Sequence, residues 1–187
     1  MAAVLFVDDE QDLLELARCF LEIPGEFSID IKTSAQEGME ALSAHPYDAI
    51  VCDYEMPGTN GVEFLKSVRL VFGDIPFIIF TGRGREQIVI DALNSGADFY
   101  IQKGGDPDAL FMELRHVIGQ AIALKQARNT LFEREQRYHD LQHANDLIQS
   151  VSPEGRFIYV NRKWRATLWY YAEEDPDLWS VDGIQEE

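Results

Sequence analysis

The chain has 187 residues, of which 46% are hydrophobic and 26% charged, so it can form one full domain plus a remainder, or two small domains. Its formal net charge of -17 argues against binding to nucleic acid or to anionic membranes, because both partners select surfaces rich in Lys and Arg. Cys19 and Cys52 match no metal-binding or redox spacing, and no segment approaches the roughly 18 apolar residues of a membrane span. We therefore expect a soluble, cytoplasmic protein without a signal peptide or a disulfide framework.

Short apolar runs alternate with amphipathic segments over residues 1–122. Helical spacing of apolar residues predicts a helix after each run, and the fifth helix begins near Asp106-Pro107. The alternation predicts an α/β fold with a doubly wound, five-stranded parallel sheet, covered by helices on both faces. The predicted strands are Ala3–Val7, Phe27–Ile31, Asp48–Cys52, Pro76–Phe80 and Asp98–Ile101. The four helices between them are marked by Leu13 to Leu21, Ala35 to Leu42, Val62 to Leu70 and Ile88 to Leu93.

The fifth helix is predicted to continue beyond the first domain, over residues 106–146. Its regular steps of four and three residues resemble a coiled-coil seam, although Arg128 and Glu135 interrupt it. Two interpretations are open: a projecting helix that pairs with a second copy, or an amphipathic helix folded back on its own domain. We favour a projecting helix that forms a homodimer. The nine seam positions are Leu110, Leu114, Val117, Ala121, Leu124, Arg128, Leu131, Glu135 and Tyr138.

Three carboxylates follow two of the predicted strands. Asp8 and Asp9 end the first apolar run, and Asp53 ends the third. Parallel strands finish on a common edge, which would bring the three side chains together. Clustered carboxylates raise one another's pKa unless a cation neutralises them, and Mg²⁺ is a hard cation that takes oxygen ligands. This pattern predicts a Mg²⁺ site.

Two further polar side chains are predicted at the same edge. Thr81 ends the fourth run and Lys103 follows the fifth, which adds a hydroxyl and an ammonium group. A carboxylate nucleophile, a metal ion and a Lys are the groups that phosphoryl transfer requires, since that reaction is catalysed mainly by positioning and charge neutralisation. The edge is therefore a candidate phosphoryl-transfer site.

Four motifs stand at the strand ends: the Asp8-Asp9 pair, VCDYEMPGTNG around Asp53, FTGRG around Thr81, and YIQK from Tyr100 to Lys103. Together and in this order they resemble the receiver domain of bacterial and archaeal response regulators, over residues 1–122. The resemblance implies a flavodoxin-like sheet and a phosphoryl-accepting switch of a two-component phosphorelay.

The resemblance also implies a role for each matching residue. Asp53 would take the phosphoryl group from the phosphohistidine of a partner sensor histidine kinase, and Lys103 would pair with the phosphoryl oxygens. Thr81 and Tyr100 would be switch residues that move after phosphorylation. Such a chain would catalyse its own phosphorylation and a slow autodephosphorylation, and would otherwise not be an enzyme.

The implied Mg²⁺ site has four contributors. The carboxylates of Asp9 and Asp53 would bind the ion directly, Asp8 would act through water, and Glu55 would contribute its backbone carbonyl. The sequence departs from the family at Gly104-Gly105, because receivers usually have Pro directly after the Lys.

Residues from about 137 onward resemble the opening of a PAS sensory domain. Ile148–Val151 and Arg156–Val160 flank the turn Pro153-Glu154-Gly155 and predict a β-hairpin, and Asn161–Leu168 predicts a helix. Glu187 is reached before the three further strands that a PAS fold needs. We therefore expect an incomplete, PAS-like α+β segment over residues 147–187, with an acidic tail from Glu173.

Two other functions use similar residues. A receiver-like scaffold or dimerisation module would keep the fold without being phosphorylated. A phosphatase of the haloacid dehalogenase type also uses an Asp nucleophile, Mg²⁺, Thr and Lys, but its nucleophile follows the first strand and a second Asp stands two residues later. Here Asp53 follows the third strand and position 55 is Glu, so the order of elements favours the switch.

Overall fold

The computed structural model describes residues 1–23, 25–82, 86–153 and 157–172. The predicted turn residues Glu154 and Gly155 and the acidic tail from Glu173 lie outside the described residues. The chain forms two compact units, residues 1–127 and residues 128–187. None of the described helices is both long enough and apolar enough to cross a membrane.

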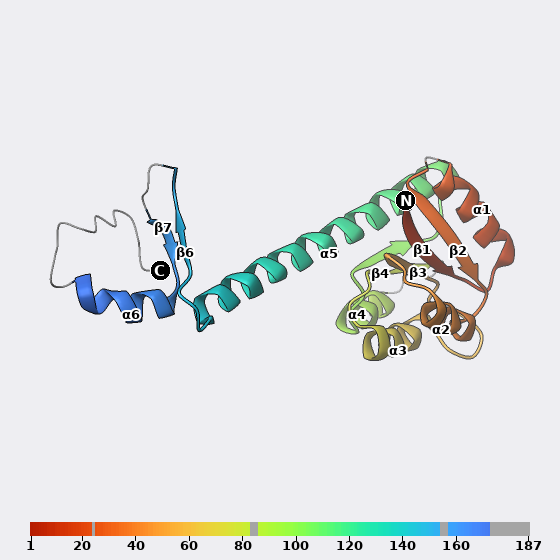
Figure 1. Ribbon diagram of the computed structural model, residues 1–187. Coiled ribbons are helices and arrows are strands. Elements are labelled where there is room, and N and C mark those ends of the chain that lie inside the picture. Colours follow the sequence, from red (N-terminus) through yellow and green to blue (C-terminus); the bar gives the residue numbers. More distant parts are fainter. Residues whose placement is uncertain (24, 83–85, 154–156, 173–187) are drawn as a thin grey trace. The chain divides into compact units, whose positions relative to one another are not determined.

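The first unit contains a five-stranded parallel sheet in the order β2-β1-β3-β4-β5 (Figure 1). The register pairs Val7 with Cys52 and Thr81 with Gln102, so these strands end side by side. The polar residues that follow the strands are therefore neighbours. The strands are β1 (Ala2–Val7), β2 (Phe27–Lys32), β3 (Ala49–Cys52), β4 (Phe77–Thr81) and β5 (Phe99–Gln102).

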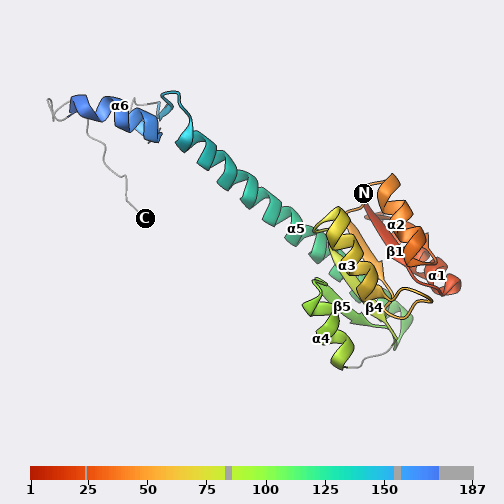
Figure 2. The same cartoon turned by 90° about the horizontal axis from the view of Figure 1, so that it is seen from below.

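Helices cover both faces of this sheet (Figures 1 and 2). One face packs against α1 (Gln11–Glu22) and the first half of α5 (Pro107–His143), and the other packs against α2 (Ala35–Ala44), α3 (Gly61–Phe72) and α4 (Glu86–Asn94). In β1, Val4 and Phe6 belong to the first core, whereas Leu5 and Val7 belong to the second. The doubly wound parallel sheet predicted from the sequence is therefore confirmed.

Some of the apolar residues that mark the predicted helices are exposed. Leu70 in α3 is 87% exposed, because the buried face of that helix runs through Val62, Leu65 and Val68. Ile90 and Leu93 in α4 are 44% and 49% exposed, while Ala92 is fully buried.

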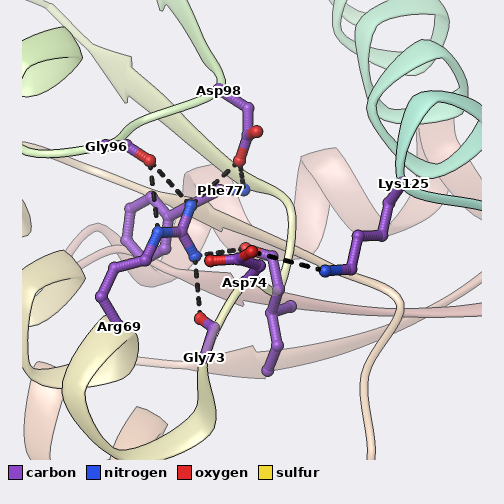
Figure 3. Close-up of polar contacts among 8 residues, drawn as sticks. Arg69, Gly73, Asp74, Phe77, Gly96, Asp98 and Lys125 are labelled. Carbon is purple, nitrogen blue, oxygen red and sulfur yellow. Dashed lines mark hydrogen bonds and ion pairs between the residues drawn. The ribbon is translucent and has the colours of Figure 1, made fainter. Parts of the chain in front are cut away.

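Arg69 links the C-terminal end of α3 to the segments that precede β4 and β5 through hydrogen bonds and an ion pair (Figure 3). Its guanidinium donates to the backbone oxygens of Gly73, Ile75 and Gly96 at distances from 2.6 to 3.3 Å. It also forms a 3.0 Å ion pair with Asp98, which accepts the N–H of Phe77. This side chain satisfies carbonyls that the end of α3 and the adjoining loops leave unpaired.

The first half of the long helix α5 packs on its own domain, and pairing of the rest with a second copy stays a prediction. Its first turns pack on the sheet, and Leu114 and Ala121 lie in the core while Leu110 and Val117 are partly buried against it. These four residues cannot belong to a seam with another chain, so the predicted nine-residue seam is wrong in its first half. From residue 126 to residue 141, every residue of α5 is exposed.

The second unit contains an antiparallel hairpin of β6 (Gln149–Val151) and β7 (Phe157–Val160), followed by α6 (Arg162–Ala172). Its centre is Asn161, a fully buried side chain. The Oδ1 atom of Asn161 accepts the N–H groups of Ile148 and Trp164, and its Nδ2 donates to the carbonyls of Ala144 and Asp146. The hairpin and the helix that the sequence predicts are present.

Candidate functional site

Three carboxylates and one Lys meet where β1, β3 and β5 end. Asp53 follows β3, and its N–H donates to the backbone oxygen of Val7 at 2.9 Å, which fixes it beside the end of β1. Asp8 is anchored in the same way by a 3.1 Å hydrogen bond from its N–H to Lys32 of β2. Asp8 and Asp53 are 0% and 5% exposed, so both carboxylates are held beneath the surface.

Lys103 is the counter-charge of the site. Its Nζ lies 2.7 Å from Oδ2 of Asp8, 3.3 Å from Oδ1 of Asp53 and 3.6 Å from Oε1 of Glu10. The backbone N–H of Lys103 donates to the oxygen of Thr81 at 2.8 Å, because β4 and β5 pair up to this point. The pairing of β4 with β5 thus places the ammonium group of Lys103 beside the carboxylates of Asp8 and Asp53.

The donor set fits a divalent cation. Asp8, Asp9 and Asp53 each offer a carboxylate oxygen, and these oxygens lie within 4.8 Å of one another. Apart from the ion pairs with Lys103, the buried atoms Oδ2 of Asp8 and Oδ1 of Asp53 accept no hydrogen bond from the described residues. One ammonium group cannot neutralise three carboxylates, and oxygen ligands of this kind are those that Mg²⁺ prefers.

The electrostatics of the buried carboxylates favour the binding of a cation. The pKa of Asp53 is raised to about 6, mainly by burial; the charge of Lys103 lowers this pKa and the nearby charge of Asp8 raises it. Burial also raises the pKa of Asp8 above its ordinary value, although Lys103 opposes this effect. Burial alone would lower the pKa of Lys103, but its contacts with Asp8 and Asp53 raise that pKa instead.

The other residues singled out from the sequence surround this cluster. Thr81 is buried at the end of β4, and Tyr100 is half-buried in β5, where burial raises its pKa. The N–H of Glu55 donates to Oδ2 of Asp53 at 3.2 Å, which places the Glu55 backbone beside the Asp53 carboxylate. Gly104 and Gly105 follow Lys103 with φ values of 143° and 85°, conformations that Pro cannot adopt.

Gly61 is a positioning residue that sequence reasoning missed. As the first residue of α3, it donates its N–H to the backbone oxygen of Tyr54 at 2.9 Å. A Cβ atom at this position would lie 2.2 Å from the backbone oxygen of Asp53. Only Gly lets α3 approach the loop after β3 so closely. The signal in the sequence was its place at the end of the motif VCDYEMPGTNG.

Comparisons with known proteins agree with this geometry. The sequence model of the family described as response regulator receiver domain matches residues 4–115. Response regulator SaeR from Staphylococcus aureus (strain USA300) is 29% identical over 195 residues, which cover 100% of this chain and 78% of that protein. The family match lies within the first unit, so the PAS-like interpretation of residues 147–187 stays a prediction.

Solved structures resemble the first unit. The Francisella response regulator 1452 receiver domain is 25% identical with a TM-score of 0.60, and the match covers 67% of this chain and 99% of that one. A response regulator receiver domain protein from Clostridium thermocellum is 27% identical with a TM-score of 0.61, covering 68% and 98%. Response regulator protein TrrA from Thermotoga maritima, solved in complex with Mg(2+)-BeF, is 26% identical with a TM-score of 0.57, covering 65% and 99%.

Proposed function

Because this chain belongs to the response regulator receiver family of two-component signalling, we propose that it is a phosphorelay switch whose phosphoryl acceptor is Asp53. The observation that carries the proposal is the contact of one ammonium group, on Lys103, with two buried carboxylates, on Asp8 and Asp53. The donor would be the phosphohistidine of a sensor histidine kinase.

In the proposed reaction, a carboxylate oxygen of Asp53 forms a bond to phosphorus while the bond between phosphorus and the donor imidazole breaks. The product is an acyl phosphate on Asp53. Since its pKa is about 6, Asp53 is mostly ionised and ready to attack at neutral pH. Lys103 would move its ion pairs from the carboxylates to the phosphoryl oxygens, which carry the developing charge.

Asp8, Asp9, Asp53 and the backbone carbonyl of Glu55 would hold Mg²⁺, whose charge would offset that of the incoming phosphoryl group. The donor chemistry described above supports this assignment, as does the Mg(2+)-BeF complex of TrrA. The chain's own contribution is to bury Asp8 and Asp53 so that both carboxylates are poorly solvated and aimed at one point.

Thr81 and Tyr100 are the proposed switch residues. Thr81 is buried at the end of β4, within the strand pair that leads to Lys103, and Tyr100 lies two residues from Thr81's partner Gln102 in β5. New contacts between Thr81 and the phosphoryl group would favour one of two arrangements of α4 and β5, which is a population shift. Slow hydrolysis of the acyl phosphate would reset the switch.

The output is proposed to pass along α5, which continues beyond the first unit and would pair with a second copy of the chain. Cys19 and Cys52 are both free thiols, which supports action in the reducing cytoplasm.

Intact-mass spectrometry after incubation with acetyl phosphate and Mg²⁺ tests the acceptor. We expect one added phosphoryl group that requires Mg²⁺ and is absent from Asp53→Asn. Asp12→Asn, at an exposed position of α1, is the matched control and should be modified like the wild type. A folded wild-type protein that gains no phosphoryl group from either acetyl phosphate or a histidine kinase would support the scaffold instead.

A further inference from the structure

Beyond Ile122, α5 carries an exposed row of side chains spaced by alternating steps of three and four residues. Leu131 and Tyr138 are 59% and 58% exposed, and the remaining surface of the Tyr138 ring packs edge-to-face on Tyr159 of β7, with ring centroids 6.1 Å apart. Only one of its six members is charged, so covering the row would remove a large apolar surface from water. This row, the distal stripe, consists of Leu124, Ala127, Leu131, Arg134, Tyr138 and Leu141.

The distal stripe is not a continuation of the face that packs on the sheet. An α-helix turns about 100° per residue, which puts the stripe roughly opposite Phe111, Leu114 and Ile118. Lys125 lies on the sheet-facing side, where its Nζ is 3.8 Å from Oδ2 of Asp74 (Figure 3). The first unit uses one side of the helix, and the stripe occupies the other side.

We infer that a second copy of the chain covers the distal stripe and that the two α5 helices run antiparallel there. The inference rests on the homodimer proposed above and specifies its face and direction. The stripe also describes the exposed half of α5 better than the seam predicted from sequence, in which two of the five exposed positions, Arg128 and Glu135, are charged.

The direction follows from the charges. In a parallel pair each core residue faces its own copy, so Arg134 would face Arg134 of the partner subunit. An antiparallel pair centred between Leu131 and Arg134 instead places Leu131 against Arg134 of the partner subunit. The aliphatic stem of Arg134 can pack there while its guanidinium reaches water.

The same antiparallel register matches the remaining residues by size and charge. Leu124 faces Leu141 of the partner subunit, and the small Ala127 faces the large Tyr138 of the partner subunit. Arg128 and Glu135 both flank the stripe on the same side. Arg128 therefore meets Glu135 of the partner subunit, and two-fold symmetry repeats this pair at the other end of the interface.

Sedimentation equilibrium of the full chain tests whether the distal stripe forms the dimer interface. We expect a dimer, and we expect Leu131→Asn to raise its dissociation constant at least about tenfold. Phe132→Asn is the matched control, because Phe132 is the next residue, is 61% exposed and lies off the stripe. A wild-type chain that stays monomeric, or a control that weakens the dimer as much as Leu131→Asn does, would overturn the inference.

Charge reversal tests the direction. Arg128→Glu and Glu135→Arg should each raise the dissociation constant about tenfold at low salt. Each substitution puts two like charges side by side at both ends of the two-fold symmetric interface. The double variant should restore wild-type affinity. A dimer in which the double variant is no tighter than the single variants overturns the antiparallel direction.

Disulfide trapping in a Cys19→Ser background tests the antiparallel direction of the two helices independently. An equimolar mixture of Leu124→Cys and Leu141→Cys chains should form the mixed disulfide, whereas each chain alone should not form a disulfide with itself. Self-linked Leu124→Cys would show a parallel dimer and overturn the inference. All these measurements use unphosphorylated protein, so their outcome is separate from whether Asp53 accepts a phosphoryl group.

Discussion

Asp53 is the residue at which burial and charge conflict most. Its proposed role as a nucleophile requires a negative charge, yet Asp53 is 5% exposed and lies near the buried carboxylate of Asp8. Lys103 relieves part of this conflict, but the pKa of Asp53 still rises to about 6. In the metal-free protein an ionised Asp53 therefore lowers the free energy of unfolding.

The sign of this effect gives a prediction. The pKa of an Asp in an unfolded chain is about 3.9, whereas the pKa of Asp53 in the folded chain is about 6. Between these two pH values, the folded chain therefore binds a proton that the unfolded chain does not. Stability should fall as the pH rises through this window. At pH 7.5 without Mg²⁺, we expect Asp53→Asn to raise the free energy of unfolding by about 1–3 kcal/mol. Urea denaturation at pH 7.5 and pH 4 measures the difference, which should nearly vanish at the lower pH.

Mg²⁺ supplies the control for this prediction. An ion that binds the ionised site should stabilise the wild type and leave Asp53→Asn much less affected, so the order of stabilities should reverse at saturating Mg²⁺. If the Asn variant is less stable than the wild type at pH 7.5 without Mg²⁺, then the charge of Asp53 is already compensated in the metal-free fold.

At the scale of elements, the site depends on how closely α3 approaches the loop after β3. Asn60 caps α3 by accepting the N–H groups of Val62 and Glu63, and the Glu63 side chain accepts the N–H of Asn60 in return. The cap fixes where the helix begins, and Gly61 then lies against the backbone of Asp53. The start of α3 and the loop after β3 are thus positioned together.

Gly61→Ala should damage this arrangement. The new Cβ would lie 2.2 Å from the Asp53 oxygen, so α3 or the loop must move. We expect a loss of about 1–3 kcal/mol in the free energy of unfolding and a slower phosphorylation of Asp53. Thermal denaturation and time-resolved intact mass measure the two effects.

Gly119→Ala is the matched control for Gly61→Ala. Gly119 lies within α5, and a Cβ there would meet no atom within 4 Å. Because Ala favours helix over Gly, this variant should be as stable as the wild type or up to about 1 kcal/mol more stable. Equal effects of the two substitutions would mean that the close approach at Gly61 does not determine the site.

At the scale of the whole molecule, the chain holds two separate structural centres. The first unit is organised by two hydrophobic cores on either side of the sheet. The second is organised by Asn161 and by Trp164, whose ring packs on Phe157 and whose Nε1 donates to Gln149 at 2.9 Å. Each unit should therefore lose structure without disturbing the other.

Asn161→Ala tests this independence. The substitution removes the acceptor for the N–H groups of Ile148 and Trp164, so we expect the second unit to lose about 2 kcal/mol or more. Hydrogen exchange should speed up in β6, β7 and α6 and stay unchanged in β1 to β5. Asn129→Ala, at an exposed position of α5, is the control and should change neither unit. Faster exchange throughout the sheet would show that the units unfold together.

Local sequence patterns are enough to predict the parallel sheet, the carboxylates at its strand ends and the long fifth helix. The apolar runs predict strands that are buried on both faces. The polar residues at the ends of these runs are Asp8, Asp9, Asp53 and Lys103, and they can be read from the sequence directly. The apolar periodicity of α5 could not distinguish the face that packs on the sheet from the face that points outward, because both faces are apolar.

Which residues of α5 are buried could not be predicted from the helical pattern, since burial depends on where the sheet lies. The tertiary structure also shows that Lys103 contacts Asp8 and Asp53 at once, and that α3 tolerates no side chain at Gly61. Contacts of this kind join segments far apart in the chain, and they form only when the register of the strands brings those segments within a few ångströms.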